Sequence, residues 1–285
     1  MFILISYNID SIMKKTLKIL ELNDLSLVIL SSEDYSYLWS DFTNLWNRYC
    51  NNLKISKYLI TTAKKGRINN FKILSSKLDK FDFWSKRILS SVKKINTKNL
   101  LVLTDDSFIS EKLDLQKFFE TYQFFKKKKI KYLQLSPTYN VSFKKKISFI
   151  NYYSFHRISL QPCLWRKEYF LKMLSYKENP REFEVNGSIR TKVNEKIYYA
   201  NYFIIKYIEI IRKGKMTPEG HNLIKKEFKK IKKNYKKMTF IELFDHFYKK
   251  YKGLLFYVLP SNFKKSFVKR KIQLYKSTKS LQRPM

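Results

Sequence analysis

Short apolar runs alternate with longer amphipathic stretches through the first half of the chain. Such short, continuous runs are typical of buried strands, and they cover residues 26–30, 57–62, 100–104 and 131–135. Between them, apolar residues recur every three or four positions, which predicts helices over residues 41–51, 84–95 and 115–125. Asp114 is the expected cap of the last helix. Strands that alternate with helices predict βαβ units, right-handed crossovers and a largely parallel sheet.

The pattern changes after residue 150. Residues 155–160 alternate between apolar and polar side chains, as a strand does, and Gln161-Pro162 ends the run. We expect a helix over residues 166–176 and a loop over residues 177–184. No internal repeat and no linker rich in proline or glycine divides the sequence.

The last part of the chain is predicted to be helical and basic. Thr217 is a good N-cap and Pro218 suits the first helical position. A further helix is expected over residues 240–251. The first of these helices has an apolar face formed by Leu223, Ile224, Phe228, Ile231 and Tyr235. The last three residues of that face, with their flanking lysines, either attach to an anionic membrane leaflet or pack on the domain with the lysines in water.

Composition supports a globular protein. The chain has 285 residues, of which 44% are hydrophobic and 17% aromatic, enough for one large domain with an appendage and too apolar for disorder. Cys50 and Cys163 are far from a disulfide scaffold. The first residues do not resemble a secretory signal, and no apolar run is long enough to span a bilayer. We therefore expect a cytoplasmic protein with reduced thiols.

The charge balance is strongly basic. Lys and Arg number 59 against 23 acidic residues, which gives a formal net charge of +36. Lysine far outnumbers arginine, as in chains encoded by AT-rich genomes, so much of this excess is expected on solvated surface. A positive field of this size still attracts anionic lipids, nucleic acids or nucleotide-sugar phosphates. The inner face of the cell membrane, an anionic surface, is therefore an expected partner.

Standard enzyme motifs are missing from the sequence. It has no Gly-x-Gly-x-x-Gly, no Gly-Lys-Ser/Thr phosphate loop and no Gly-x-Ser-x-Gly elbow, which argues against dinucleotide, P-loop and hydrolase enzymes. His156, His221 and His246 lie far apart, without a cysteine pair at metal-ligand spacing. Carboxylates are the remaining candidates for chemistry.

Two adjacent carboxylates, Asp105 and Asp106, follow the apolar run at residues 100–104. In open α/β sheets, ligands bind beyond the carboxyl ends of the strands. An acidic pair at that point can hold a divalent cation, and the cation can hold a diphosphate. The alternative is a polar turn in which Asp106 helps to cap the element that follows.

Several later motifs resemble those of one protein family. They are Arg157-Ile-Ser-Leu-Gln-Pro-Cys-Leu-Trp-Arg166 with its continuation to Leu174, then Glu178-Asn-Pro-Arg-Glu-Phe-Glu184 with Gly187-Ser188, and Ile211-Arg-Lys-Gly-Lys-Met-Thr-Pro-Glu219. In this order, after a strand that ends in acidic residues, they resemble glycosyltransferase-like proteins of bacterial polysaccharide clusters, which are similar to the GT-A superfamily. The resemblance covers most of the chain from about Trp84 onward.

The resemblance implies an α/β fold of GT-A type, with a Rossmann-like, mostly parallel sheet flanked by helices. A glycosyltransferase domain is then expected over residues 1–215, with a nucleotide-binding half at about 20–136 and an acceptor half at about 137–215. A basic helical region at 216–285 is expected to pack on it. The implied ligands are a nucleotide-sugar donor, a glycan or lipid-linked acceptor, and Mg²⁺ or Mn²⁺ held by Asp105 and Asp106. The chain departs from the family's Asp-x-Asp motif, because Ser107 stands at the second motif position.

The resemblance also suggests which residue removes the acceptor proton. Glu184 is the first candidate for this base and Glu182 the second, and a single base of this kind gives inversion at the anomeric carbon. The alternative is that either glutamate pairs with Arg181 or Arg190.

Other polar residues are candidate ligand contacts. Ser32 and Glu33 follow the first strand, where they either bond the nucleotide base or form a turn. Lys86 either meets a phosphate or lies on a solvated helix face. The acceptor candidates are Arg157, Gln161 and Trp165. Trp165 also stands at helical spacing from two apolar residues, which favours a place in the core.

Two other functions stay open at this point. A catalytically inactive GT-A-like scaffold in surface-polysaccharide assembly is consistent with the Asp-Asp-Ser departure. A nucleic-acid-binding protein is favoured by the basic charge and by Tyr248-Lys-Lys-Tyr-Lys252, which interleaves aromatic and charged residues. Scarce arginine and the lack of a recognised nucleic-acid motif argue against it.

Overall fold

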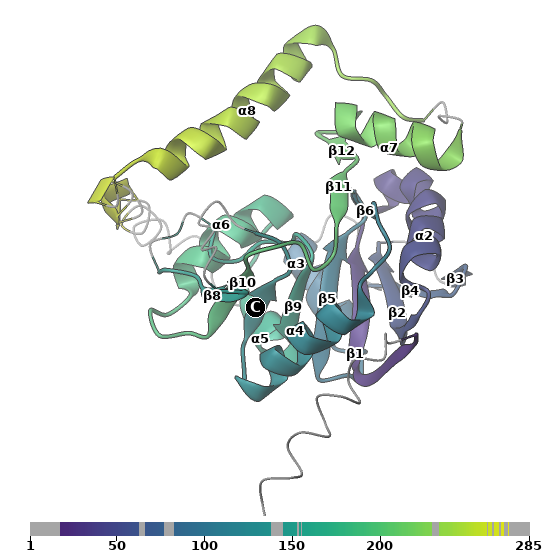
Figure 1. The fold of residues 1–285 in the computed structure, drawn as a ribbon, viewed down its shortest axis with the longest axis horizontal. Helices are drawn as coiled ribbons and strands as arrows, with labels where there is room; N and C mark the ends of the chain where they lie inside the picture. Colours follow the sequence, from purple (N-terminus) through teal and green to yellow (C-terminus); the bar gives the residue numbers. More distant parts are fainter. Residues whose placement is uncertain are drawn as a thin grey trace, which may run out of the picture.

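A nine-stranded sheet, covered by helices on both faces, forms the centre of the molecule (Figure 1). The computed structural model describes residues 18–62, 66–76, 83–137, 145–152, 154, 156–229, 234–260, 262–263, 265–267, 269–270 and 273. The strands of this sheet are β1 (Leu20–Leu30), β2 (Leu53–Thr61), β3 (Gly66–Ile68), β4 (Phe71–Ser75), β5 (Asn99–Thr104), β7 (Tyr132–Gln134), β8 (Ile147–Phe149), β9 (Cys163–Arg166) and β10 (Ile197–Ala200).

The strand order is β3-β4-β2-β1-β5-β9-β7-β10-β8. β4, β2, β1, β5, β7 and β10 run in one direction, whereas β3, β8 and β9 run against it. This mostly parallel sheet confirms the expected α/β class. The segment β4-β2-β1-β5 has the 3-2-1-4 order of nucleotide-binding doubly wound sheets.

Two helical layers cover the sheet, and both β1 and β5 are buried on both faces. In β1, Leu27 and Ile29 face one layer whereas Val28 and Leu30 face the other, as the two-residue period of a strand requires. The first layer consists of α2 (Ser36–Cys50), α4 (Leu115–Lys127) and α7 (Pro218–Phe228), and the second of α3 (Trp84–Val92), α5 (Lys167–Met173) and α6 (Pro180–Arg190). A short 3-10 helix, η1 (Glu33–Tyr35), precedes α2, and α8 (Phe240–Val258) lies outside both layers (Figure 1).

Four short strands build the edge of the molecule beyond β5. β6 (Ser107–Ile109) pairs antiparallel with β11 (Tyr207–Glu209). A hairpin of β12 (Ile211–Arg212) and β13 (Lys215–Met216) follows directly. Its two-residue turn holds Lys213 at φ 51° and Gly214 at φ 75°, the left-handed conformation that a tight hairpin turn of this type needs. Residues 207–216 are thereby brought next to the segment that follows β5.

The apolar patterns predicted most of these elements correctly. The four strands expected in the first half correspond to β1, β2, β5 and β7, and the three helices to α2, α3 and α4. Asp114 caps α4, because its Oδ1 accepts from the Lys117 backbone N–H at 3.0 Å. Thr217 caps α7 in the same way, with its Oγ1 accepting from the Gly220 N–H at 2.9 Å.

Two expectations for the second half are wrong. The described residues between 156 and 160 form no strand, and the strand lies instead at β9, after Gln161-Pro162. The segment 177–184 is not all loop, because α6 begins at Pro180. A reciprocal capping box explains that start: Asn179 Oδ1 accepts from the Glu182 N–H, and Glu182 Oε2 accepts from the Asn179 N–H, both at 2.9 Å.

The segment around α7 packs on the domain rather than facing outward. Leu223 and Ile224 are buried in the core. Tyr235 is only 5% exposed, and its hydroxyl donates to Asp41 Oδ2 at 2.8 Å. Ile231 lies outside the described residues. Of the two interpretations of this face, the structure therefore supports packing on the domain over contact with a leaflet.

The close approach of α7 to the main chain of Ile210 gives a stability prediction. A Cβ added at Gly220 would stand 2.8 Å from Ile210 Cα and O. Because backbone atoms cannot move aside, we expect Gly220→Ala to lower the free energy of unfolding by about 1–3 kcal/mol, measured by urea denaturation. Ser40→Ala, at an exposed position of α2, serves as the control and should change it by less than about 0.5 kcal/mol. Equal stability of the two variants would contradict the packing described.

Candidate active site

The candidate site lies where the strand order reverses. From β1 the chain builds β2 and β4 on one side, and it then returns to place β5 on the other side of β1. The carboxyl ends of β1 and β5 are paired through Leu30 and Thr104. In open α/β sheets, the crevice beyond such a reversal is where ligands bind. Ser31 and Asp105 are the first residues beyond these two ends.

A chain of hydrogen bonds fixes Asp105 at this point. Its Oδ2 accepts from Ser31 Oγ, which in turn accepts from Trp39 Nε1 at 2.7 Å. The Asp105 backbone N–H donates to Leu30 O at 3.2 Å. The residue is only 6% exposed. Asp105 is therefore held rigidly by groups from β1 and α2.

Asp106 lies beside it, half-buried, and is joined to a distant part of the chain. Its carbonyl accepts from the Ile210 N–H at 2.7 Å, and the β6–β11 pairing sets Glu209 opposite Ser107. Arg212 forms an ion pair with Glu209, with Nε 3.1 Å from Oε1. Residues more than 100 positions apart thus bring a third carboxylate and a guanidinium to the acidic pair.

Burial and mutual repulsion shift the titration of these carboxylates. Burial raises the pKa of Asp105 well above its usual value, and the charge of Asp106 adds to this, whereas the hydrogen bonds from Ser31 and Trp39 oppose it. Burial raises the pKa of Asp106 to about 6, with a further contribution from the charge of Glu209. A carboxylate pair in this state gains from a bound proton or a bound cation.

Glu184 belongs to the same electrostatic cluster. It lies on α6, and its Oε1 accepts from the Leu160 N–H at 2.6 Å and from Ser159 Oγ at 2.8 Å. Burial raises its pKa, and the charge of Glu209 adds to the effect. Glu209 therefore acts electrostatically on both Asp106 and Glu184. Glu182, two residues earlier, uses its carboxylate in the capping box of α6.

Polar residues from β7 and the entry to β9 line the neighbouring part of the edge. Gln134 Nε2 donates to Gln161 Oε1 at 3.1 Å and to Ser136 Oγ at 3.0 Å. Because β9 runs antiparallel to β5 and β7, its beginning lies at their carboxyl ends. Gln161 is exposed there, and it is the only predicted acceptor contact with an exposed side chain.

The other two acceptor candidates lie in the interior. Trp165 is fully buried, with its ring 4.6 Å from that of Tyr132 and 4.9 Å from that of Phe170. Arg157 is fully buried as well, and its Nη1 donates to Thr191 Oγ1 at 2.6 Å and to Lys192 O at 2.9 Å.

Two of the predicted nucleotide contacts directly follow the carboxyl end of β1. Ser32 occupies the N-cap position of η1, and Glu33 is the first residue of that helix; both are half-buried. Lys86 lies in the first turn of α3, also half-buried. Sequence reasoning missed Trp39, Glu209 and Arg212. Glu209 stands just before the motif at 211–219, but only the pairing of β6 with β11 shows that it lies opposite Ser107, next to the acidic pair.

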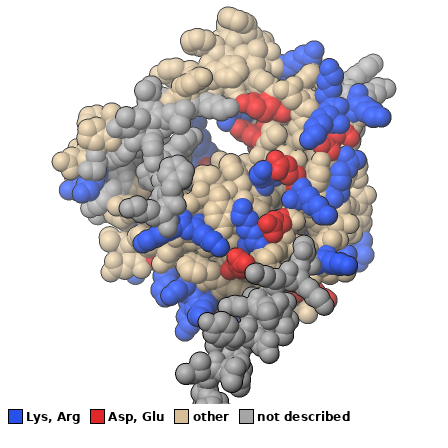
Figure 2. Space-filling view, viewed as in Figure 1, with Lys and Arg blue, Asp and Glu red and all other residues tan. Residues whose placement is uncertain are grey.

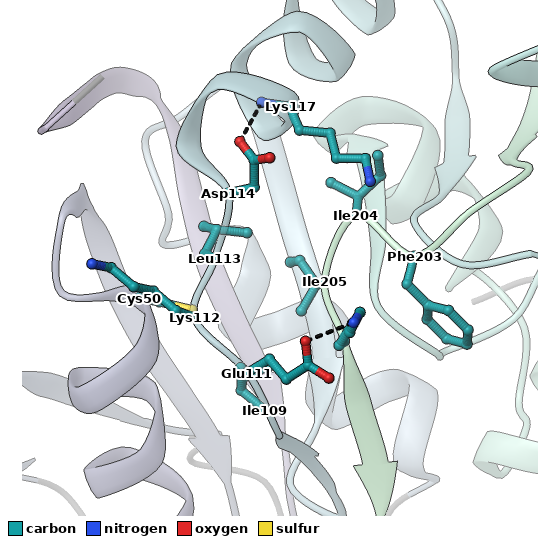
Figure 3. Close-up of a pocket in the computed structure, with 11 residues that line it drawn as sticks. Cys50, Ile109, Glu111, Lys112, Leu113, Asp114, Lys117, Phe203, Ile204 and Ile205 are labelled. Atoms are coloured by element: carbon teal, nitrogen blue, oxygen red, sulfur yellow. Dashed lines mark hydrogen bonds and ion pairs between the residues drawn. The ribbon is translucent and has the colours of Figure 1, made fainter. Parts of the chain in front are cut away.

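A separate cavity lies between the segment after β6 and residues 203–206 (Figure 3). Glu111 pairs with Lys206 at 2.6 Å, and Asp114 caps α4. Burial raises the pKa of the Cys50 thiol, which also lines the cavity, so the thiol stays protonated. This cavity contains none of the carboxylates of the candidate site and offers no activated nucleophile.

The acidic pair provides two carboxylates as possible ligands of a metal ion. Among the residues that the structure describes, no group of three or more His, Cys, Asp or Glu side chains is placed to hold a metal ion. Mg²⁺, however, is often bound by one or two carboxylates, with substrate phosphates and water completing its coordination. Asp105 and Asp106 fit that smaller requirement.

Comparisons with known proteins give structural matches only. No protein-family model and no curated protein matches the sequence. A mannosyltransferase from Pyrobaculum calidifontis in complex with GDP-Man and Mn²⁺ matches with a TM-score of 0.44 and 5% identity over 73% of this chain and 64% of that one. Staphylococcus aureus TarS 1–349 matches with a TM-score of 0.40 and 11% identity over 62% and 60%. A Leptospira borgpetersenii cytidylyltransferase matches with 0.41 and 11% over 82% and 97%.

The chain thus spans about three fifths of the TarS fragment and of the mannosyltransferase. All three TM-scores lie below 0.5.

The raised pKa values predict how stability depends on pH. A carboxylate whose pKa is higher in the folded than in the unfolded protein stabilises the fold at acid pH and loses that contribution as pH rises through the folded value. For Asp106, this loss falls between about pH 4 and pH 6. We expect Asp105→Asn/Asp106→Asn to melt at a higher temperature than the wild type at pH 7.5, and the difference to shrink at pH 4.5.

The matched control is Asp34→Asn, an exposed acidic residue near the same edge, which should leave the melting temperature unchanged at both pH values. A double variant that is destabilised equally at both pH values would show that hydrogen bonding, and not repulsion between buried charges, dominates at the pair.

Proposed function

We propose that the chain is a glycosyltransferase that moves a sugar from a nucleotide-sugar donor to a glycan or lipid-linked acceptor. The observation that carries the proposal is the carboxylate pair Asp105 and Asp106, held at the reversal of strand order. Buried carboxylates whose pKa values are raised by burial and by a neighbouring charge cluster at functional sites. The family resemblance of the motifs at 157–219 supports the same chemistry.

The donor is proposed to lie across the carboxyl ends of β1 and β5. Ser32 and Glu33 would meet the base, and Lys86 would contribute positive charge near the phosphates. Asp105 and Asp106 would hold Mg²⁺ or Mn²⁺, which supplies positive charge to the departing diphosphate. Since Asp105 is fixed by Ser31 and Trp39, little reorganisation is needed when the donor binds.

Glu184 is the proposed base. Its raised pKa suits a group that takes a proton from a hydroxyl near neutral pH. Leu160 N–H and Ser159 Oγ both bind Oε1, which fixes the carboxylate while Oε2 receives the proton. A single base on the acceptor side gives inversion at the anomeric carbon. Gln161 would orient the acceptor, and Glu182, engaged in its capping box, is the second candidate.

Donor binding provides the first test. We expect one class among UDP-, GDP-, CMP- and dTDP-linked sugars to raise the melting temperature in the presence of Mn²⁺, because a ligand that binds only the folded state stabilises it. At 100 times Kd the gain is about 2.7 kcal/mol. Asp105→Asn/Asp106→Asn should abolish the shift, and Asp34→Asn should keep it. A folded wild type that no nucleotide sugar stabilises would contradict the proposal.

Turnover separates an enzyme from an inactive scaffold. Glu184→Gln should keep donor binding and lower kcat at least 100-fold, because general-base catalysis typically contributes 10²–10⁴-fold. In the wild type, kcat/KM should fall as pH decreases through the raised pKa of Glu184. Donor binding without transfer to any glycan or lipid-linked acceptor would favour the scaffold, and unchanged turnover in Glu184→Gln would remove this residue from the mechanism.

A further inference from the structure

An exposed apolar face runs along α8. Phe240 is 85% exposed, Phe244 is 70% exposed and Tyr251 is 63% exposed. Positions 240, 244, 247 and 251 recur at the spacing of one helical face. Further exposed apolar or aromatic residues of this region are Ile241, Phe247, Tyr248, Phe263 and Phe267. A run of this length on one helix exceeds the isolated apolar residues that are normal on a surface.

The opposite side of α8 holds the helix to the domain. Asp245 forms an ion pair with Lys213 of the β12–β13 turn at 3.3 Å. His246 is buried, with its Nε2 3.3 Å from Glu219 Oε2 of α7. Because these contacts use the polar side, the apolar face is turned away from the protein. This is the reverse of a helix that packs on a globular core.

The charge of the region identifies what covers this face. Residues 240–285 contain eleven Lys or Arg against two acidic residues. A second copy of the region 240–285 would bring two net positive charges together, whereas an anionic lipid surface is complementary to this region. None of the described helices is long and apolar enough to cross a membrane. We propose that α8 lies in the interface of an anionic lipid bilayer, with its apolar face inserted among the headgroups and acyl chains.

The position of α8 ties this surface to the candidate site. Its two contacts are made to Lys213 and Glu219, and both follow Glu209, the carboxylate next to Asp106, within ten residues. Figure 1 shows α8 on the side of the sheet where β6 and β11 lie. A lipid surface bound by α8 is therefore on the same side of the molecule as the acidic pair.

Basic charge by itself does not orient the protein. Figure 2 shows Lys and Arg distributed over this face of the molecule with acidic residues between them, whereas the surface over the first half of α8, at the top of the view, is free of both Lys and Arg. The apolar face is thus the feature that selects one orientation.

Vesicle co-sedimentation of the full chain tests the inference. The probes are vesicles of phosphatidylcholine alone and of phosphatidylcholine with 30% phosphatidylglycerol. We expect binding to the anionic vesicles only. Phe240→Ser/Phe244→Ser should weaken it about tenfold or more, and Ile19→Ser/Val193→Ser, which removes similarly exposed apolar side chains elsewhere, should leave it unchanged.

A second variant reports insertion directly. Phe244→Trp should show a blue shift of its fluorescence and protection from aqueous quenchers with anionic vesicles, measured against the same vesicles with the wild type. Absence of vesicle binding, or equal binding by the serine variant, would overturn the inference, as would dimerisation in solution that Phe240→Ser/Phe244→Ser abolishes. The readouts are independent of nucleotide-sugar binding, so they can fail or succeed separately from the proposed function.

Discussion

The burial of Asp105 beside Asp106 is the constraint on which the site depends. A carboxylate removed from water at the end of a strand is unfavourable unless hydrogen bonds or a cation compensate it. In this chain Ser31 supplies the hydrogen bond and Trp39 fixes Ser31. The compensation is incomplete, since the pKa of Asp105 stays well above its usual value. The fold thus leaves an unfavourable electrostatic energy at Asp105, and a cation bound together with the donor would relieve it.

The second half of the chain completes this arrangement through a pairing of only three residues. β11 pairs with β6 and sets Glu209 beside the acidic pair. The position of β11 in turn depends on α7, because Thr217 N–H donates to Ile210 O at 2.9 Å and Gly220 packs against the same main chain. Packing at the start of α7 is therefore coupled to the electrostatics of Asp106. Loss of that packing would alter the site without any change in its carboxylates.

Local sequence patterns were sufficient to predict many of the strands and helices. The runs at 26–30 and 100–104 are recognisable because both faces of β1 and β5 are buried, and the caps at Asp114 and Thr217 depend only on neighbouring residues. The strand expected at 155–160 failed because alternation in a short segment does not require a pairing partner. The loop expected over residues 177–184 is wrong because the capping box of Asn179 starts a helix there, and Pro180 is well suited to the first turn of that helix.

The residues of the candidate site show the same difference between local patterns and long-range contacts. Asp105 and Asp106 were found because a strand and its end are adjacent in sequence, whereas Glu209 and Arg212 depend on long-range pairing that no local pattern encodes. Trp165 shows the converse: its chemistry suits a sugar contact, but its burial among Tyr132 and Phe170 is a tertiary property.

The proposed membrane attachment depends on the geometry of the surface as well as on its charge. A net charge of +36 attracts any polyanion, and attraction that is spread over the surface leaves every orientation nearly equal. An inserted apolar face selects one orientation, because only that side of the molecule gains by leaving water. The ion pair between Asp245 and Lys213, and the contact of His246 with Glu219, connect α8 to the segment that leads from Glu209. Orientation at the bilayer and access to the acidic pair would then be set by one continuous stretch of chain, which suits an acceptor carried on a lipid.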